Sequence, residues 1–148
     1  MTKKSVFGFE EPKDSPGYLL WKTTTAWQRQ IKASLSPYGV SHAQFVIMAA
    51  VTWFTENDQP ANQVNIATLS GLDKMTVSKS LKKLSGMSLI KRTEDKRDTR
   101  AKYVSLTVKG LELIAKLVPV VEGVDEAFFG ALTITDQRAL IKLFNRLV

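Results

Sequence analysis

Residues 95–110 have the sequence DKRDTRAKYVSLTVKG, and the local pattern around this stretch indicates the fold. Residues 95–99 are charged or polar throughout, which is typical of a turn. Residues 89–93 before the turn indicate a short strand that carries outward basic side chains, and residues 103–106 alternate between apolar and polar side chains as a returning strand. We therefore predict a β-hairpin of two short strands joined by a charged turn.

Two short helices are predicted directly before this hairpin. Asn62 is suited to cap the first, which ends at Gly71, and Asp73 is suited to cap the second, which ends at Gly86. The second helix has an apolar face at positions i, i+4 and i+7, formed by Val77, Leu81 and Leu84. This order of elements is that of a winged helix-turn-helix. The fold class that we predict is mainly α with a small β-hairpin wing (α+β).

The rest of the chain is expected to form one unit with this lobe. Residues 1–16 show no sustained period and are predicted to be a flexible arm, whereas residues 17–148 form a single unit. Within it, residues 41–107 make the winged lobe, and residues 17–36 and 108–148 supply terminal helices that expose much apolar surface. Such surface needs a partner. The apolar positions expected to face inward in the two last helices are Leu111, Ile114, Leu117, Val118, Val121, Leu140, Phe144 and Leu147.

Composition restricts the classes of function. The chain has 148 residues, of which 44% are apolar, enough for one packed core. Its apolar runs are too short to span a bilayer and no export signal is evident, so we expect a cytoplasmic protein without a membrane partner. With no cysteine, a thiol switch is excluded, and the lone His42 is interpreted as a surface or capping residue. Lacking a glycine-rich phosphate loop and a supported carboxylate pair, the chain is expected to be no enzyme and to hold no metal or cofactor.

The positive charge is concentrated in one segment. Between Asp73 and Gly110 there are eleven Lys/Arg and four Asp/Glu, a net charge of +7, which equals the formal net charge of the whole chain. The other residues are therefore neutral overall. A basic segment in a neutral frame favours a polyanion partner, because binding phosphates releases condensed counterions. The alternative is a solvated basic face without a partner.

The wing sequence matches a known family motif. Residues 95–110 resemble the D-x-R-D-x-R…V-x-L-T-x-K-G signature of the multiple-antibiotic-resistance-regulator (MarR) family, and the preceding helix and strand are similar to that family's recognition helix and first wing strand. The resemblance extends from about Gly17 to Val148. It implies a sequence-specific regulator of transcription, by family default a repressor, that binds a pseudo-palindromic double-stranded operator as a homodimer through interlocked terminal helices. Ser85 before Gly86 departs from the family pattern.

The second helix of a helix-turn-helix enters the major groove with its first residues near base edges. By position, the residues that reach base edges are Lys74, Thr76, Ser78 and Lys79, while Lys82 and Lys83 hold phosphates. At the wing, Arg97 is expected to enter the minor groove, and Asp95 and Asp98 to stiffen the turn by pairing with Arg97 or Arg100. The alternative is that these charges only keep the surface soluble.

A small aromatic or phenolic effector, which the resemblance implies, would bind between the dimer helices and the lobe. Five residues are candidates for its pocket: Tyr18, Trp21, Phe45, Met48 and Trp53. Aromatic residues at helical spacing are also typical of plain core. As a whole, the chain has one rival interpretation, a winged-helix module that binds protein or RNA without operator specificity.

Overall fold

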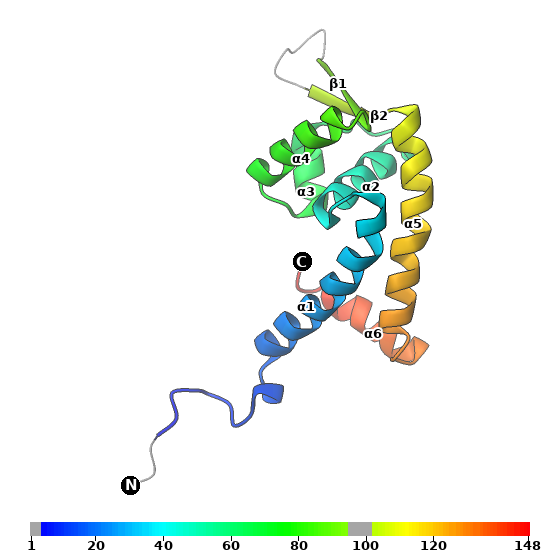
Figure 1. The fold of residues 1–148 in the computed structure, drawn as a ribbon. Coiled ribbons are helices and arrows are strands. Elements are labelled where there is room, and N and C mark those ends of the chain that lie inside the picture. The colour runs from blue at the N-terminus through cyan, green and yellow to red at the C-terminus, as the bar shows by residue number, and fades with distance from the viewer. Residues whose placement is uncertain (1–3, 95–101) are drawn as a thin grey trace.

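The computed structural model describes residues 4–94 and 102–148. Within these residues the chain forms six α-helices, two short 3-10 helices and a two-stranded antiparallel sheet (Figure 1). In chain order the elements are η1 (Pro12–Asp14), α1 (Pro16–Leu35), η2 (Ser36–Tyr38), α2 (His42–Glu56), α3 (Gln63–Ser70), α4 (Lys74–Gly86), β1 (Ile90–Glu94), β2 (Lys102–Leu106), α5 (Val108–Phe129) and α6 (Ile134–Phe144). Helix α1 is capped by Ser15 and begins at Pro16, the predicted last residue of the arm.

Helices α2, α3 and α4 pack with the hairpin into one lobe, which confirms the predicted winged helix-turn-helix. Its core contains fully buried aliphatic side chains from each helix and from the segment before β1, including Ile47, Val51, Ile66, Val77, Leu81, Leu84 and Leu89. Each such side chain contributes roughly 1.5–3 kcal/mol by leaving water. The predicted caps are present, because Asn62 Oδ1 accepts from the Asn65 N–H and Asp73 Oδ1 accepts from the Thr76 N–H, both at 2.8 Å.

The hairpin pairs Ile90 with Leu106 and Glu94 with Lys102. Strand β1 thus begins one residue later than predicted. The reason is local: Ser88 has a left-handed backbone with φ 59°, and the Leu89 carbonyl accepts the Thr107 N–H at 3.0 Å at the start of α5. Leu89 is therefore a core residue that ties the wing to α5.

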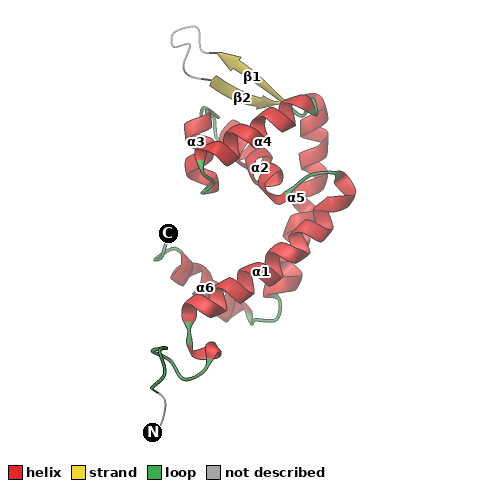
Figure 2. Cartoon of the chain, turned by 60° about the vertical axis from the view of Figure 1, so that its left-hand side comes forward, coloured by secondary structure: helices red, strands yellow, loops and turns green. Residues whose placement is uncertain are grey.

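Helices α1 and α5 lie side by side and lead away from the lobe, and α6 lies at the far end of the molecule (Figures 1 and 2). Trp27 Nε1 of α1 donates to Asp125 Oδ1 of α5 at 2.7 Å. Helix α5 is unbroken through Pro119. Among the described residues, no helix combines the length and the apolar character needed to cross a membrane.

The inward face predicted for α5 is correct in part. Ile114, Leu117 and Val121 are buried, but Leu111 is 52% exposed because it lies on the side of α5 away from the core. The prediction for α6 is wrong for this chain taken alone. Phe144 and Leu147 are exposed, and no residue of α6 is buried. Helix α6 follows the Gly130 turn beyond the core that α1 and α5 share, so its apolar side has no covering element in the same chain.

Candidate nucleic-acid interface

Helix α4 presents two opposite faces. Val77, Leu81 and Leu84 are buried against the lobe. Met75, Lys79 and Lys82 follow the same i, i+4, i+7 spacing on the opposite side, and all three are exposed. The structure thus places a largely cationic surface on the outer side of the second helix of the helix-turn-helix.

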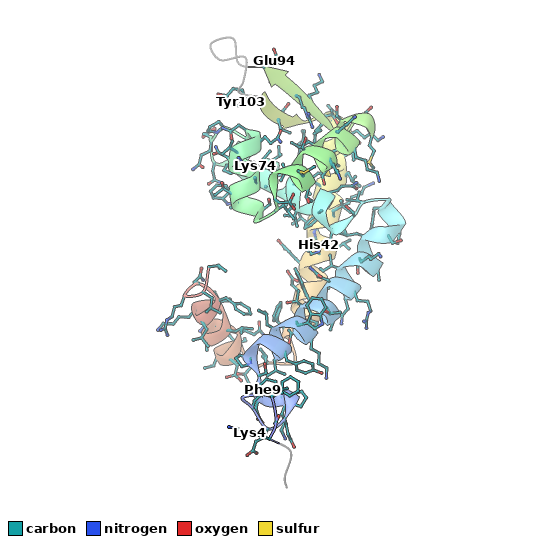
Figure 3. The ribbon with its side chains drawn as sticks, turned by 90° about the vertical axis from the view of Figure 1, so that its left-hand side faces the viewer. Lys4, Phe9, His42, Lys74, Glu94 and Tyr103 are labelled. Carbon is teal, nitrogen blue, oxygen red and sulfur yellow. The ribbon has the colours of Figure 1, made fainter. Side chains whose placement is uncertain are left out.

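Most of the residues predicted to contact DNA on α4 lie on or beside this outer face. Lys74, Ser78, Lys79 and Lys82 are exposed, and Figure 3 shows Lys74 on the lobe, well away from the arm with Lys4 and Phe9. Within residues 4–94 and 102–148 the one ion pair joins Lys13 and Glu11 at 2.7 Å. No carboxylate in the described part of the chain therefore pairs with the α4 lysines, which leaves their ammonium groups available to a polyanion.

Thr76, which is predicted to reach a base edge, is hydrogen-bonded within the cap of α4. Its side chain is only partly exposed, its Oγ1 donates to Asp73 Oδ2 at 2.7 Å, and its N–H donates to Asp73 Oδ1. These bonds hold the pKa of the Asp73 carboxyl below its ordinary value, the hydroxyl bond being the largest cause. Thr76 therefore supports the cap of α4, and its hydroxyl donor is already used.

Lys83 lies on a third side of α4, turned toward α1. It lines a cleft of about 820 Å³ together with Trp27, Lys32, His42, Ser70 and Leu72. The cleft separates the end of the recognition helix from α1 and from the start of α2, near the place where Figure 3 labels His42. Lys83 is thus shared between the cationic lobe and a cleft of ligand size.

The five residues predicted to form an effector pocket are not brought together in either cavity described by the structure. Met48 is fully buried and Phe45 nearly so, both in the core of the lobe. Tyr18, Trp21 and Trp53 are 43%, 72% and 47% exposed, respectively. The cleft beside Lys83 is lined by Trp27 and His42 instead. These residues come from α1 and from the start of α2, and helical spacing alone could not show that a turn of chain brings them together.

His42 and Trp27 form an aromatic corner in this cleft. Their rings meet edge to face, with centroids 5.1 Å apart. The indole N–H of Trp27 donates a hydrogen bond to the Asp125 carboxylate. Burial lowers the pKa of His42 from its ordinary value of 6.5, and the nearby Asp125 carboxylate opposes this effect. At neutral pH the imidazole is therefore uncharged, and the cations of the cleft are Lys32 and Lys83.

The tip of the wing lies outside the described residues, and so do Asp95, Arg97, Asp98 and Arg100. The strands are described, and they show a contact between the wing and the recognition helix that sequence reasoning missed. Arg92 of β1 reaches back to α4, where Nη2 donates to the Ser78 carbonyl oxygen at 3.4 Å, and its buried Nε has no hydrogen-bond partner among the described residues. Strand alternation, which places Arg92 on the same side as Ile90, was the available signal.

Comparison with known proteins agrees with this architecture. Residues 36–123 match the family model described as ArnR1-like, winged-helix domain. The chain is 33% identical over 123 residues to the HTH-type transcriptional regulator YdcH of Bacillus subtilis, an overlap of 83% of this chain and 84% of YdcH. This chain belongs to the MarR family of winged helix-turn-helix regulators.

Solved structures have the same fold, and a MarR-family regulator from Rhodococcus sp. RHA1 superposes with a TM-score of 0.82 at 19% identity, covering 94% of this chain and 96% of that chain. BpsR of Bordetella bronchiseptica superposes with a TM-score of 0.84 at 22% identity, covering 95% of this chain and 97% of BpsR. CouR of Rhodococcus jostii RHA1 superposes with a TM-score of 0.81 at 20% identity, covering 94% and 95% of the two chains. The relatives found by sequence are regulators of transcription and not enzymes, and this MarR-family protein is itself a DNA-binding regulator of transcription.

Proposed function

We propose that the protein represses transcription by binding a pseudo-palindromic operator as a homodimer. The observation that carries this proposal is the outer face of α4, where exposed lysines that have no carboxylate partner among residues 4–94 and 102–148 lie beside the wing strands. Helix α4 enters the major groove, Lys74, Ser78 and Lys79 approach base edges, and Lys82 and Lys83 hold phosphates. Arg97 enters the adjacent minor groove, supported by Asp95, Asp98 and Arg100.

Exposed apolar side chains support the homodimer. They gather on the first half of α1 and along α6, at the end of the molecule opposite the wing: Leu19, Leu20, Trp21, Ile134, Ile141, Leu143, Phe144 and Leu147. Two copies that bury these surfaces against each other carry two recognition helices related by a two-fold axis, and such a pair matches a pseudo-palindrome.

The operator proposal is tested by comparing the protein's affinity for three nucleic acids at one salt concentration: its own upstream intergenic DNA, a random duplex and RNA. We expect the intergenic duplex to bind at least about a thousandfold more tightly than the random duplex. Equal affinity for both duplexes would overturn the proposal, and tighter binding of RNA would favour the rival RNA-binding module.

Substitutions separate base reading from charge. Arg97→Ala should weaken binding to the intergenic duplex by about 1–3 kcal/mol and relax the preference for A·T pairs beside the major-groove site.

Lys82→Ala should weaken binding to the intergenic and the random duplex alike, and should reduce the slope of log affinity against log salt concentration by about 1. Lys116→Ala is the matched control, because Lys116 is exposed on α5, away from the lobe. An Arg97→Ala loss equal on both duplexes would show that Arg97 contributes only charge.

We also propose that a small aromatic acid releases the protein from DNA by binding the cleft of about 820 Å³. Trp27 offers an aromatic wall, and Lys32 and Lys83 offer two cations without a carboxylate partner in the described chain. The DNA binding of BpsR is regulated by 6-hydroxynicotinic acid, and CouR was solved with bound p-coumaroyl-CoA. Release requires that the ligand prefers a conformation with mismatched recognition helices.

The effector proposal is tested by titrating the DNA-free protein with 2-naphthoate and with its neutral analogue 2-naphthamide. We expect the acid to bind more tightly, and Lys32→Gln to remove that difference. Equal binding of acid and amide would overturn the assignment of an anionic ligand. Binding of the acid that leaves operator affinity unchanged would overturn its regulatory role.

A further inference from the structure

Met75 is the second residue of α4 and is 69% exposed. This large apolar side chain lies on the same helical side as Lys79 and Lys82, opposite the buried Val77. A partner that covers Met75 therefore also meets the neighbouring lysines. Nucleic acid suits both, because phosphates can bind the lysines while the groove floor meets the Met75 side chain beside them.

The first turn of α4 has few other groups that can read a base. The Thr76 hydroxyl and N–H are both bonded to Asp73. Lys74 is a point charge that binds phosphates and guanine with little geometric definition. Met75 therefore provides an exposed apolar contact surface at this end of the helix. It carries no charge or strong hydrogen-bonding group, so it can recognise only an apolar group.

Among the four unmodified base pairs, the apolar group in the major groove is the C5-methyl group of thymine. We propose that Met75 is a specificity-determining residue that packs against a thymine methyl in each operator half-site. The flexible thioether chain can adapt to a methyl at slightly different heights in the groove. This inference rests on the proposed function, because it requires that α4 enters the major groove of an operator.

The test first selects the preferred duplex from random double-stranded DNA with the full-length protein. Each thymine of that duplex is then replaced, one at a time, by uracil, which keeps every hydrogen-bonding group and lacks only the methyl. We expect one uracil-sensitive position per half-site, with about fourfold weaker binding, as the loss of one buried methyl predicts. Substitution in both half-sites should weaken binding about fifteenfold, since the two contacts are separate.

Variants of Met75 connect the effect to this side chain. Met75→Leu should keep the thymine preference, whereas Met75→Gln, of similar length but polar, should bind the thymine and uracil duplexes equally. Val64→Ala is the matched control, because Val64 is 67% exposed on the neighbouring helix α3, and this variant should keep the preference.

Two results would overturn the inference while leaving the operator proposal intact: a selected duplex without any uracil-sensitive thymine, or a thymine preference that persists in Met75→Gln. Failure to select any preferred duplex would instead overturn operator binding itself, and the role of Met75 with it.

Discussion

His42 is the one histidine of the chain, and its half-buried ring packs edge to face against Trp27. The sequence places it at the start of a helix, which led to its interpretation as a surface or capping residue. The capping is done by its neighbours Ser41 and Gln44, whose side chains accept each other's backbone N–H groups. The partners of His42 come from α1 and α5, which pattern reasoning along α2 could not foresee.

The lowered pKa of His42 predicts a pH dependence of stability. The unfolded chain takes up the proton near pH 6.5, while the folded chain resists it because the ring is partly desolvated. The free energy of unfolding should therefore fall as pH drops through 6.5 and level off below the lowered folded pKa. Urea unfolding from about pH 8 to about pH 5 should show a larger loss for the wild type than for His42→Gln.

A depressed His42 pKa would be contradicted if the two proteins lost the same free energy of unfolding over this range. Trp27→Phe is a useful companion variant, because it removes the hydrogen bond to Asp125 but keeps an aromatic ring beside His42. It should leave Asp125 freer to stabilise the imidazolium, so the pH dependence should become weaker.

The junction between the wing and α5 shows how elements are held in place. Thr107 caps α5 by accepting the Gly110 N–H at 3.0 Å, and its own hydroxyl donates to the Ser88 carbonyl at 2.6 Å. Lys109 Nζ donates to the Met87 carbonyl at 3.1 Å, just past the end of α4. The first turn of α5 thus holds the end of the recognition helix and the beginning of the wing.

Gly110 is required at this junction because a side chain there has no room. A Cβ at position 110 would overlap the backbone carbonyl of Leu89, which cannot rotate away. Gly110→Ala should therefore destabilise the protein by about 1–3 kcal/mol and loosen the wing.

Gly123→Ala is the control in the same helix, where the space around the residue is open. This substitution should stabilise the protein by about 0.5–1 kcal/mol. Denaturant midpoints of the two variants provide the measurement, and a neutral Gly110→Ala would show that the junction is not closely packed.

At the scale of the whole molecule, the lobe has its own core, whereas α6 has none. A groove of about 380 Å³ between α5 and α6 is lined by Phe129, Leu140, Ile141 and Phe144, with Asp125 and Glu126 among its polar residues. Ile141 is 61% exposed. An amphipathic helix that is only partly covered in its own chain gains stability when another surface covers its apolar side, and a second copy supplies a matching surface by symmetry.

The homodimer proposal therefore predicts a specific sensitivity of α6. Ile141→Glu would bury an unpaired carboxylate at the dimer interface and should weaken association about a hundredfold or more. Thr135→Glu makes the same charge change beside Arg138 and Lys142 on the polar side of α6 and should leave association nearly unchanged. Sedimentation at micromolar concentration distinguishes dimer from monomer. A wild-type monomer, or equal effects of both variants, would contradict the placement of the interface.

The sequence by itself determined the order of elements, because caps, turn residues and apolar periodicity are local signals. Asn62, Asp73 and Thr107 begin helices where predicted, and Val77, Leu81 and Leu84 form the buried side of α4. The same local pattern placed Lys74, Ser78, Lys79 and Lys82 on an exposed face. These signals suffice because each depends on neighbours a few residues away.

Only the tertiary structure decided which side chains share an environment. In the structure, the Thr76 hydroxyl donates to Asp73, and Arg92 contacts the recognition helix. Lys83 lines a cleft together with Trp27 and His42, whose rings are in contact. The tertiary structure also left Met75 as the exposed apolar side chain on the outer face of α4. Contacts between residues far apart in sequence depend on how whole elements pack, and packing is decided by the summed fit of many side chains, which no local pattern encodes.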